Sequence, residues 1–585
     1  MKKLKNFLKK LKQTNKKIKS KIKKIINTIK KFFSKYIKKI KKIIKKISKK
    51  INKLKTPVKK ILKVIWKILK VLYKIFIVIF RIAKKLANLA LLFIVVLMYY
   101  AVDWIIDTYG NLPVDELIFQ ISMPIGGTEE GLVNSFWGTN LKPTLLIVIP
   151  VWIVVTIIFD LVRRYNFIFK LKTDGNERTL RVKSIFVYVL LVVIELLILY
   201  IPVNTSLEKL HIREYIEKSK KESTFIQDNY VDPKSVNITF PKKKQNLIYI
   251  YSESLESSYF SRDLGGNEDY NLMSNITELT LNNINFSNTD KIGGGFASYG
   301  TTYTSGGLTG QTLGIPVKLD GSEVNNDYNH MSFLRGAYGL GNILEDNGYN
   351  QVFMIGSDKE FGNRNVLFRD HGNYTIYDYS SAIDEGKIDK NYRVWWGYED
   401  EKLFEYSKEK ILELSKSKKP FNFTMLTTGT HFPNGYAEES CPYIYDDPYS
   451  NAINCSMGRI NEFVNWIQSQ EFGKNTTIII SGDHLSMDTA HFANYGNYER
   501  TVYNLFINSK VTPVNTKNRK FNTLDMYPTT LAALGVKIEG DKLALGTNLF
   551  SNKKTLTEEY GMDYINEEFA KKSSYYNVNF ILLKK

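Results

Sequence analysis

Three residues able to bind a metal ion follow two apolar, strand-like runs of this sequence. Glu253 comes shortly after NLIYIY at 246–251, and Asp483 and His484 come shortly after TTIII at 476–480. Carboxylate and imidazole groups suit a divalent cation such as Mn²⁺ or Mg²⁺. Such an ion polarises a phosphoryl oxygen and lowers the pKa of a nearby hydroxyl, which then becomes a nucleophile. These residue types therefore predict metal-assisted phosphoryl transfer.

A stretch rich in glycine, serine and threonine at 293–317 supplies candidate hydroxyls. It reads GGGFASYGTTYTSGGLTGQTLGIPV and contains Thr301, Thr302 and Thr304. Glycine lets a backbone approach an anion closely and adopt φ/ψ values that other residues avoid. The same composition is typical of an ordinary loop, so the functional interpretation depends on the metal-binding candidates that accompany it.

The elements that must position these residues alternate between two periodicities. Strand-like runs at 246–251, 351–355, 421–426 and 476–480 are separated by helical stretches such as 403–414 and 460–468. This alternation predicts an α/β domain with a largely parallel sheet. Ligands of such sheets bind beyond the carboxyl ends of the strands, which is where the candidate residues lie.

The amino-terminal end is strongly basic. Residues 1–102 contain 33 Lys, one Arg and no acidic residue, a charge of +34 in a chain of net charge +24, so residues 103–585 carry −10. Within 18–54, apolar residues recur at steps of three and four, which predicts an amphipathic helix. We expect residues 1–60 to bind an anionic membrane surface rather than nucleic acid, because hydrophobic spans follow directly. A solvated, disordered tail is the alternative.

Hydrophobic runs and loop charges predict a membrane protein of about three spans. The loop between the second and third spans is basic and the loop between the first and second is acidic, which places the N-terminus in the cytoplasm and the rest beyond 203 outside. The expected regions are a polybasic cytoplasmic region at 1–70, a membrane domain at 71–203 (spans 86–106, 144–162 and 184–203), a linker at 204–245, a catalytic domain at 246–550 and a peripheral C-terminal tail at 551–585.

The chain has two cysteines, Cys441 and Cys455, and no Cys/His spacing typical of a zinc site. Outside the cytoplasm they would be suited to forming a disulfide. Two free, partly buried thiols are the alternative.

The motifs ES after the first strand, TYTSGG at 302–307, TTGTH at 427–431, SGDH at 481–484 and LDMYPTTLAALGV at 524–536 occur in this order. Together they resemble the lipoteichoic acid synthase and phosphoglycerol transferase branch of the alkaline phosphatase/sulfatase superfamily, over about 246–550. The resemblance implies a mixed sheet flanked by helices. It implies Thr304 as a nucleophile that forms a covalent phosphoglycerol-threonine, and one divalent cation, Mn²⁺ or else Mg²⁺, bound by Glu253, Thr304, Asp483 and His484.

The resemblance also implies that His431 and Arg364 contact the substrate phosphate and glycerol phosphate. The segment IGSDKEFGNR at 355–364 departs from lipoteichoic acid synthases, which have His first, Asp third and Trp eighth. Asp358 is the candidate replacement for the missing acid. The stretches 430–436 and 339–349 and the cysteine pair look more like the phosphoglycerol transferases that modify membrane-derived oligosaccharides. We interpret Trp395 and Trp396 as packing residues rather than as a platform for a sugar.

The sequence therefore predicts an enzyme of the bacterial cell membrane, active in cell-envelope biogenesis, with its catalytic domain outside. It would move glycerol phosphate from phosphatidylglycerol to a glycolipid, a teichoic-type polymer or a glycan. A phosphoethanolamine transferase, or another sulfatase-like phosphodiester hydrolase, is the enzymatic alternative. A non-catalytic membrane scaffold whose working part is the Lys-rich end is the alternative of a different class.

Overall fold

The computed structural model describes residues 42, 46, 56–110, 112–122, 130–165, 167–173, 176–318 and 332–582. The amphipathic helix expected within 18–54 therefore lies almost entirely outside the described residues. The chain divides into two compact units, residues 1–91 and 92–585, and the site described below lies within the second.

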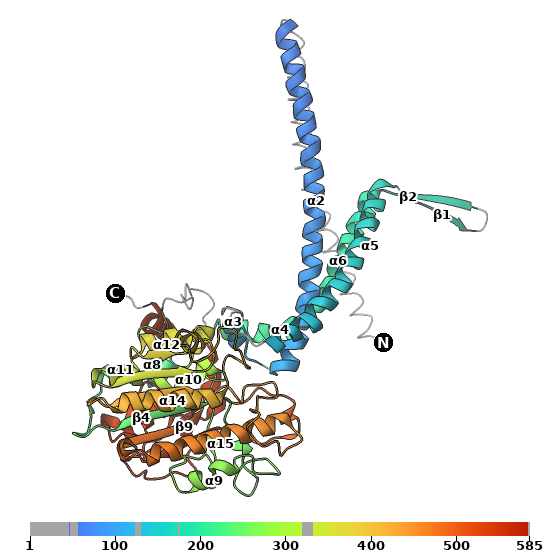
Figure 1. Ribbon diagram of the computed structural model, residues 1–585. Helices are drawn as coiled ribbons and strands as arrows, with labels where there is room; N and C mark the ends of the chain where they lie inside the picture. The colour runs from blue at the N-terminus through green and yellow to red at the C-terminus, as the bar shows by residue number, and fades with distance from the viewer. Residues whose placement is uncertain are drawn as a thin grey trace. The chain divides into compact units, whose positions relative to one another are not determined.

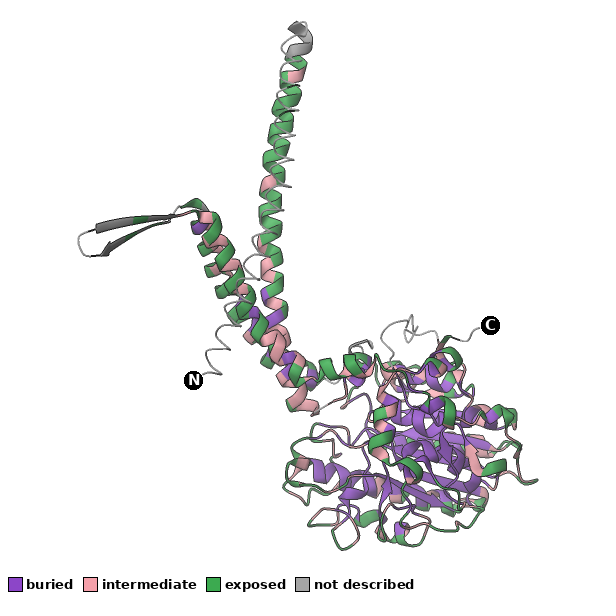
Figure 2. Ribbon diagram, turned by 180° about the vertical axis from the view of Figure 1, so that it is seen from behind, coloured by how far each residue is buried: buried purple, intermediate pink, exposed green. Residues whose placement is uncertain are grey.

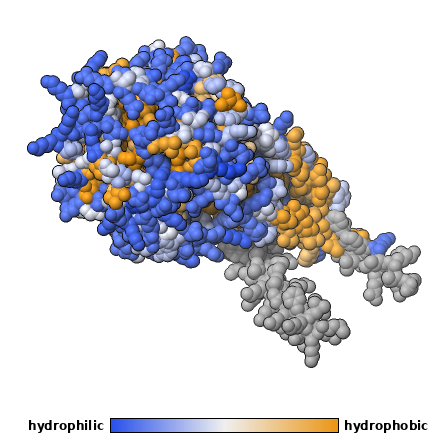
Figure 3. Space-filling view, turned by 90° about the horizontal axis from the view of Figure 1, so that it is seen from below, coloured by the Kyte–Doolittle hydropathy of each residue, from blue (hydrophilic) through white to orange (hydrophobic). Residues whose placement is uncertain are grey.

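Among the described residues, three helices are long and apolar enough to cross a membrane: Lys60–Tyr109, Glu130–Val162 and Ser184–Lys209. The first corresponds to α2 (Thr56–Tyr109) and the third to α6 (Ser184–Lys209). The second is formed by α4 (Glu130–Phe136), a π-helical turn (Trp137–Leu141) and α5 (Lys142–Arg164). Each contains one of the expected spans. Their large apolar side chains are mostly exposed. Figure 3 shows apolar side chains gathered on one part of the visible surface. A basic hairpin of β1 (Phe167–Thr173) and β2 (Asn176–Val182) joins α5 to α6.

The acidic connection between the first two spans is folded rather than a simple loop. It contains α3 (Val114–Ser122), α4 (Glu130–Phe136) and a π-helical turn at Trp137–Leu141. In α3, Val114 and Phe119 are buried together with the acidic pair Asp115 and Glu116. This segment packs against the catalytic domain, where it forms part of the site.

The centre of the domain is a seven-stranded sheet in the order β5-β10-β9-β4-β8-β6-β7. The strands from β9 to β7 are parallel, whereas β10 and β5 run antiparallel to their neighbours. The bounds are β4 Asn246–Ser252, β5 Gly294–Gly295, β6 Asn350–Ile355, β7 Thr375–Tyr377, β8 Phe421–Leu426, β9 Thr476–Gly482 and β10 Val502–Ile507. All four strands expected from the sequence are present, and the largely parallel sheet is confirmed.

Alternate residues of the strands face two apolar cores, one on each side of the sheet. In β4, Tyr249 belongs to one core and Ile250 to the other. The first core is covered by α10 (Thr304–Leu313), α11 (Leu340–Asp346), α12 (Arg364–Asp370) and α16 (Met526–Ala533). The second is covered by α9 (Ser274–Leu281), α14 (Asp400–Ser415) and α15 (Pro448–Ser469). Helices therefore lie on both faces (Figure 1), and the strands between them are buried (Figure 2).

The segment expected as a peripheral tail contributes to the core instead. It forms α17 (Leu556–Tyr560), α18 (Met562–Ala570), α19 (Ser574–Tyr576) and a π-turn at Asn577–Leu582. Phe569, Tyr576 and Phe580 are buried in the first core, and Phe569 meets Phe225 of α8 (Phe225–Asn229) with ring centroids 5.9 Å apart. The expected linker and tail thus pack against each other, because their aromatic residues bury apolar area that a solvated tail would expose.

Candidate active site

The candidate metal ligands directly follow two neighbouring parallel strands. Strand β4 pairs with β9, with Ser252 opposite Gly482, so that Glu253 and Asp483 leave the sheet at the same edge. Helix α10 begins at Thr304 and packs closely on this edge. A Cβ on Gly307 would lie 2.0 Å from the carbonyl oxygen of Asp483, so only glycine allows this approach. The glycine-rich stretch therefore brings a helix, rather than only a loop, against the strand end.

Glu253, Asp483 and His484 form a compact buried cluster. One ligand atom from each lies within 4.8 Å of the others. His484 Nε2 is 3.2 Å from Glu253 Oε1 and 3.4 Å from Asp483 Oδ2. The sequence-predicted ligands are thus brought together in a geometry that a single ion could occupy.

Neighbouring groups fix the orientation of each ligand. The Asp483 Oδ1 atom accepts hydrogen bonds from the backbone N–H groups of Ser254 (2.8 Å) and His484 (2.9 Å). His484 Nδ1 donates to the carbonyl of Leu485 at 2.7 Å, which leaves Nε2 as the ligand atom. Asp483 Oδ2 is buried and has no hydrogen-bond partner among the described residues. A buried carboxylate oxygen without a donor is costly unless a cation neutralises it, so these residues fit a divalent metal ion.

The electrostatics of the cluster favour the same interpretation. Burial and the neighbouring Glu253 raise the pKa of Asp483. Burial also opposes the charged forms of the other two groups, but attraction between opposite charges prevails. Attraction to Asp483 and Glu253 raises the pKa of His484 to about 10, and attraction to His484 holds the pKa of Glu253 below its usual value. The protonated imidazole is thus the positive charge that balances two carboxylates, and a bound metal ion would displace that proton.

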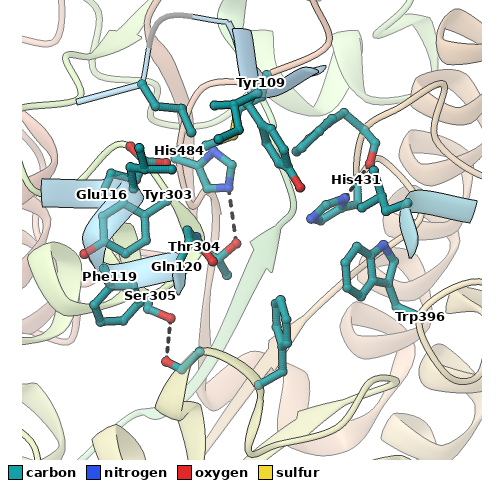
Figure 4. A pocket seen from close by; sticks show the side chains of 18 of the residues that line it. Tyr109, Glu116, Phe119, Gln120, Tyr303, Thr304, Ser305, Trp396, His431 and His484 are labelled. Carbon is teal, nitrogen blue, oxygen red and sulfur yellow. Dashed lines mark hydrogen bonds between the residues drawn. The ribbon is translucent and has the colours of Figure 1, made fainter. Parts of the chain in front are cut away.

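Thr304 is the threonine that lies beside this cluster. Its Oγ1 atom is 3.2 Å from His484 Nε2 (Figure 4). The same atom is 3.4 Å from Glu253 Oε2. Thr301 is buried and bonded to the backbone of Ser298, and Thr302 donates to Glu116. As the first residue of α10, Thr304 also lies at the positive end of a helix dipole, where an anionic phosphate is stabilised.

An apolar cavity of about 410 Å³ opens onto Thr304. One wall comes from the catalytic domain and the other from the end of α2 and from α3 and α4. The catalytic-domain residues are Tyr303, Thr304, Ser305, Phe361, Gly362, Arg364, Trp396, His431, Phe432, His484 and Met487. The membrane-proximal residues are Ala101, Trp104, Ile105, Tyr109, Leu112, Glu116, Leu117, Phe119, Gln120, Leu132 and Phe136. Across the cavity, Phe119 packs on Tyr303 with ring centroids 5.0 Å apart.

The three predicted substrate-binding residues have different positions. His431 lines the cavity, its Nδ1 donates to the carbonyl of Phe432 at 2.6 Å, and its ring faces Thr304 and His484 in Figure 4. Arg364 also lines the cavity and is buried, with its Nε atom unpartnered among the described residues. Asp358 is not among the lining residues. Its Oδ1 accepts the N–H of Glu360, and its carbonyl accepts Arg364, so a role in binding substrate stays a prediction.

Glu116 is a site residue that the sequence analysis did not identify. Its side chain is 1% exposed, and Oε2 accepts a hydrogen bond of 2.7 Å from Thr302 Oγ1. Its Oε1 has no partner among the described residues. Burial raises the pKa of Glu116 to about 7. The available signal was the pattern VDELIFQIS at 114–122, an amphipathic turn of helix between two spans, which we interpreted only as an acidic loop.

The loop that carries His431 is covalently tied to a helix. Cys441 and Cys455 form a disulfide, with Cys455 on α15. The expected disulfide is therefore present, and the alternative of two free thiols is wrong.

Comparison with known proteins agrees with this architecture. The sulfatase family model matches residues 245–536, so this part of the chain is a sulfatase-family domain. Phosphoglycerol transferase I of Salmonella choleraesuis is 31% identical over 322 residues, which cover 54% of this chain and 40% of that protein. The protein of the same name from Escherichia coli is also 31% identical, with the same coverage. The matched region thus spans less than half the length of these relatives.

Solved structures with partial similarity to this chain include a lipoteichoic acid synthase and an integral membrane phosphoethanolamine transferase. The lipoteichoic acid synthase LtaP from Listeria monocytogenes has a TM-score of 0.44 at 15% identity, covering 56% of this chain and 82% of its own. The phosphoethanolamine transferase EptA from Neisseria meningitidis has a TM-score of 0.47 at 12% identity, covering 77% of this chain and 84% of its own.

Proposed function

We propose that this protein transfers glycerol phosphate from phosphatidylglycerol to an acceptor hydroxyl at the outer face of a bacterial membrane. The observation that carries the proposal is the position of Thr304. It lies beside a metal-ligand cluster and also at the end of an apolar cavity whose second wall is built by residues that lie in or between candidate membrane spans. A soluble phosphate ester would not need such a cavity, whereas a lipid donor has acyl chains to bury there.

In the first step Thr304 Oγ1 attacks the phosphorus of the lipid. The bond between phosphorus and the diacylglycerol oxygen breaks, and a phosphoglycerol-threonine forms. The proton that Thr304 loses is transferred to the released diacylglycerol oxygen. His431 suits this transfer: burial lowers its pKa, so the ring is neutral, and because Nδ1 is occupied by Phe432, Nε2 can accept and return a proton.

In the second step the acceptor hydroxyl attacks the same phosphorus, the bond to Thr304 breaks, and the acceptor proton returns to Thr304. Arg364 lines the cavity near the reacting group, and its Nε–H, which has no partner in the described part of the chain, can bind a phosphate oxygen. Glu253, Asp483, His484 and Thr304 would hold a divalent cation, for which we propose Mn²⁺ ahead of Mg²⁺. When bound, this ion supplies Lewis-acid polarisation and makes the Thr304 hydroxyl more acidic.

A phosphoethanolamine transferase is the second candidate, and Glu116 is the observation that favours it. Its buried Oε1 has no partner among the described residues and would suit an ammonium group. The carboxyl is equally able to bond a glycerol hydroxyl, particularly in the neutral form that its raised pKa favours.

Purified full-length protein in detergent, supplied with Mn²⁺ and phosphatidylglycerol, should release diacylglycerol. Phosphatidylethanolamine in a parallel reaction separates the two candidates. Thr304→Ala should abolish release, and mass spectrometry should find a glycerol-phosphate adduct on Thr304 of the wild type. Thr312→Ala is the matched control, because Thr312 lies on the same helix and its hydroxyl bonds to the carbonyl of Leu308. Release of diacylglycerol that persists in Thr304→Ala would show that Thr304 is not the nucleophile and would contradict the proposed function.

A further inference from the structure

The hydroxyl of Tyr449 joins two of the loops that carry the site. Tyr449 is fully buried in the first turn of α15, and its Oη lies 2.9 Å from the carbonyl oxygen of Thr430 and 2.6 Å from Oγ of Ser486. Thr430 directly precedes His431, and Ser486 follows the proposed ligand His484 by two residues. One side chain therefore bonds the loop after β8 and the loop after β9 at the same time.

We propose that Tyr449 is a positioning residue, whose hydroxyl fixes the spacing between the proposed metal ligands and His431. The inference rests on the proposed function, because it presupposes the roles given there to the ligand cluster and to His431. Tyr449 is not among the residues that line the Thr304 cavity, so it acts through the loops that it joins and not by contact with the lipid.

The donors and acceptors of this junction are matched. The Tyr449 hydroxyl has a single hydrogen, which it donates to the carbonyl of Thr430. Its oxygen then accepts the hydroxyl of Ser486, and Ser486 Oγ accepts in turn the backbone N–H of Asp488 at 3.2 Å. A phenylalanine at position 449 would leave a buried carbonyl and a buried hydroxyl without these partners, which is costly. The two loops would then shift toward other partners, and the groups that they carry would shift with them.

The junction also reaches the third loop of the site, which follows β4. Thr430 Oγ1 donates to the carbonyl of Glu253, so Thr430 is bonded both to Tyr449 and to a proposed ligand. The hydroxyl of Tyr259 lies 3.3 Å from that of Tyr449 and donates to the carbonyl of Ser254 at 2.9 Å. The loops after β4, β8 and β9 thus share one buried polar junction, and Tyr449 bridges the ligand on the first of them to the ligands on the last.

Ion pairs and aromatic contacts hold the Tyr449 side chain in place. Its ring meets the rings of Tyr259 and His491 edge-on, with centroids 6.3 Å and 5.1 Å apart. His491 Nδ1 donates to Asp447 at 2.9 Å, and His491 Nε2 is 3.1 Å from Glu268 Oε1. Asp447 is also the N-cap of α15, the helix that carries Tyr449. The hydroxyl is therefore presented by a side chain that its surroundings fix, as the positioning of reactive groups requires.

The affinity for Mn²⁺ tests the proposal without turnover. We expect calorimetry of the full-length protein in detergent to give a Kd for Mn²⁺ that is about tenfold higher for Tyr449→Phe than for the wild type. Ser486→Ala removes a partner of the same hydroxyl and should weaken Mn²⁺ binding in the same way, which keeps the test available if Tyr449→Phe does not fold. Equal Mn²⁺ affinity in these variants and the wild type, or a wild type that binds no Mn²⁺, would overturn the assignment.

Tyr503→Phe is the matched control. Tyr503 is equally buried, and its hydroxyl bonds to that of Thr280 at 2.6 Å, away from the residues that line the Thr304 cavity. This variant also loses a buried hydrogen bond, so its unfolding temperature should fall about as far as that of Tyr449→Phe. Its Mn²⁺ affinity should nevertheless equal that of the wild type. A loss of Mn²⁺ affinity in Tyr503→Phe as large as in Tyr449→Phe would show that any buried hydroxyl has this effect, and the positioning role would be wrong.

Turnover separates this inference from the proposed function. Tyr449→Phe should lower kcat for diacylglycerol release about tenfold and leave the KM for phosphatidylglycerol within about twofold of the wild type. Because Tyr449 and Ser486 share one bond, the double variant should lose no more than the more affected single variant. Additive losses, or a raised KM with an unchanged kcat, would contradict the inference. Absence of diacylglycerol release from the wild type would count against the lipid donor alone, since the Mn²⁺ affinities are measured without lipid.

Discussion

Glu116 and Thr302 are 186 residues apart in the chain, and their side chains share a hydrogen bond of 2.7 Å. Thr302 lies two residues before the candidate nucleophile, and Glu116 lies on α3, between two candidate spans. The bond therefore links the membrane-proximal segment to the catalytic loop. It implies that a substitution on α3 alters catalysis although α3 lies outside the sulfatase-family domain.

We expect Glu116→Ala to lower phosphatidylglycerol turnover by about tenfold, because it leaves the partly buried Thr302 hydroxyl without its acceptor and removes a polar group from the cavity. Glu116→Gln keeps an acceptor oxygen and should retain most of the activity. Diacylglycerol release from the full-length protein in detergent measures both. If Glu116→Gln instead abolished activity toward phosphatidylethanolamine and spared phosphatidylglycerol, the carboxylate would be acting as a partner for an ammonium group.

The stability of the protein should also depend on pH through Glu116. Burial raises its pKa from 4.5 to about 7, so the folded state binds the proton more tightly than the unfolded state does. The stabilisation is complete below pH 4.5 and is lost as the pH rises through 7, a change of about 3 kcal/mol at most. Between pH 5 and pH 8 the unfolding temperature of the wild type should fall by more than the unfolding temperature of Glu116→Gln. Asp400 and Asp525 shift in the same direction, so the difference between the two proteins isolates Glu116. Identical pH dependence would contradict the assignment.

Binding of Mn²⁺ should raise the free energy of unfolding of the wild type, and one substitution should remove this increase. At a Mn²⁺ concentration 100 times its Kd, the free energy of unfolding of the wild type rises by about 2.7 kcal/mol. Asp483→Asn removes a ligand and should abolish the gain. Without metal, however, Asp483→Asn should be at least as stable as the wild type, because it removes a buried carboxylate that lies near the carboxylate of Glu253. Thermal unfolding with Mn²⁺ tests the loss of the metal-dependent gain, and thermal unfolding with a chelator tests the stability without metal. An equal gain in the two proteins would show that the ion binds elsewhere.

The fold and the ligand cluster could be predicted because both depend on local sequence. A buried strand is visible as a short apolar run, and parallel strands bring their carboxyl ends to one edge, so Glu253, Asp483 and His484 were expected to meet. The choice of Thr304 over Thr301 came from the resemblance of TYTSGG to a family loop. In the structure Thr304 Oγ1 lies beside the ligand cluster, whereas Thr301 Oγ1 donates to the carbonyl of Ser298; the role of Thr304 as nucleophile stays a prediction.

The remaining parts of the site depend on contacts between distant segments, which no local pattern encodes. Asp115 and Glu116 were part of the acidic loop expected between the first two spans, and an acidic loop gives no indication that Glu116 is buried against Thr302. Trp395 and Trp396 were both interpreted as packing residues. Only the fold shows that Trp395 is partly exposed, whereas Trp396 is buried and lines the Thr304 cavity. The aromatic residues after 551 gave no periodic signal, although Phe569, Tyr576 and Phe580 complete a core.

The approach of α10 to the strand end gives a last prediction, at Gly307. A Cβ there would meet the Asp483 backbone, with the carbonyl oxygen at 2.0 Å and the carbonyl carbon at 2.7 Å. Backbone cannot rotate away as a side chain can, so Gly307→Ala must push α10 outward and carry Thr304 away from His484. We expect loss of more than 100-fold in diacylglycerol release, since displacing a nucleophile by about 1 Å costs on this order.

Gly458→Ala is the matched control for that experiment. Gly458 lies within α15, and the nearest atom to a built Cβ there is Asn275 Nδ2 at 3.6 Å, an ordinary contact. Alanine is the better helix former, so this variant should unfold at the same temperature as the wild type or a higher one and keep full activity. The Mn²⁺-dependent gain in stability should be reduced in Gly307→Ala but not in Gly458→Ala, because Thr304 is one of the proposed ligands. A fully active Gly307→Ala protein would mean that the helix need not contact the strand end for Thr304 to react.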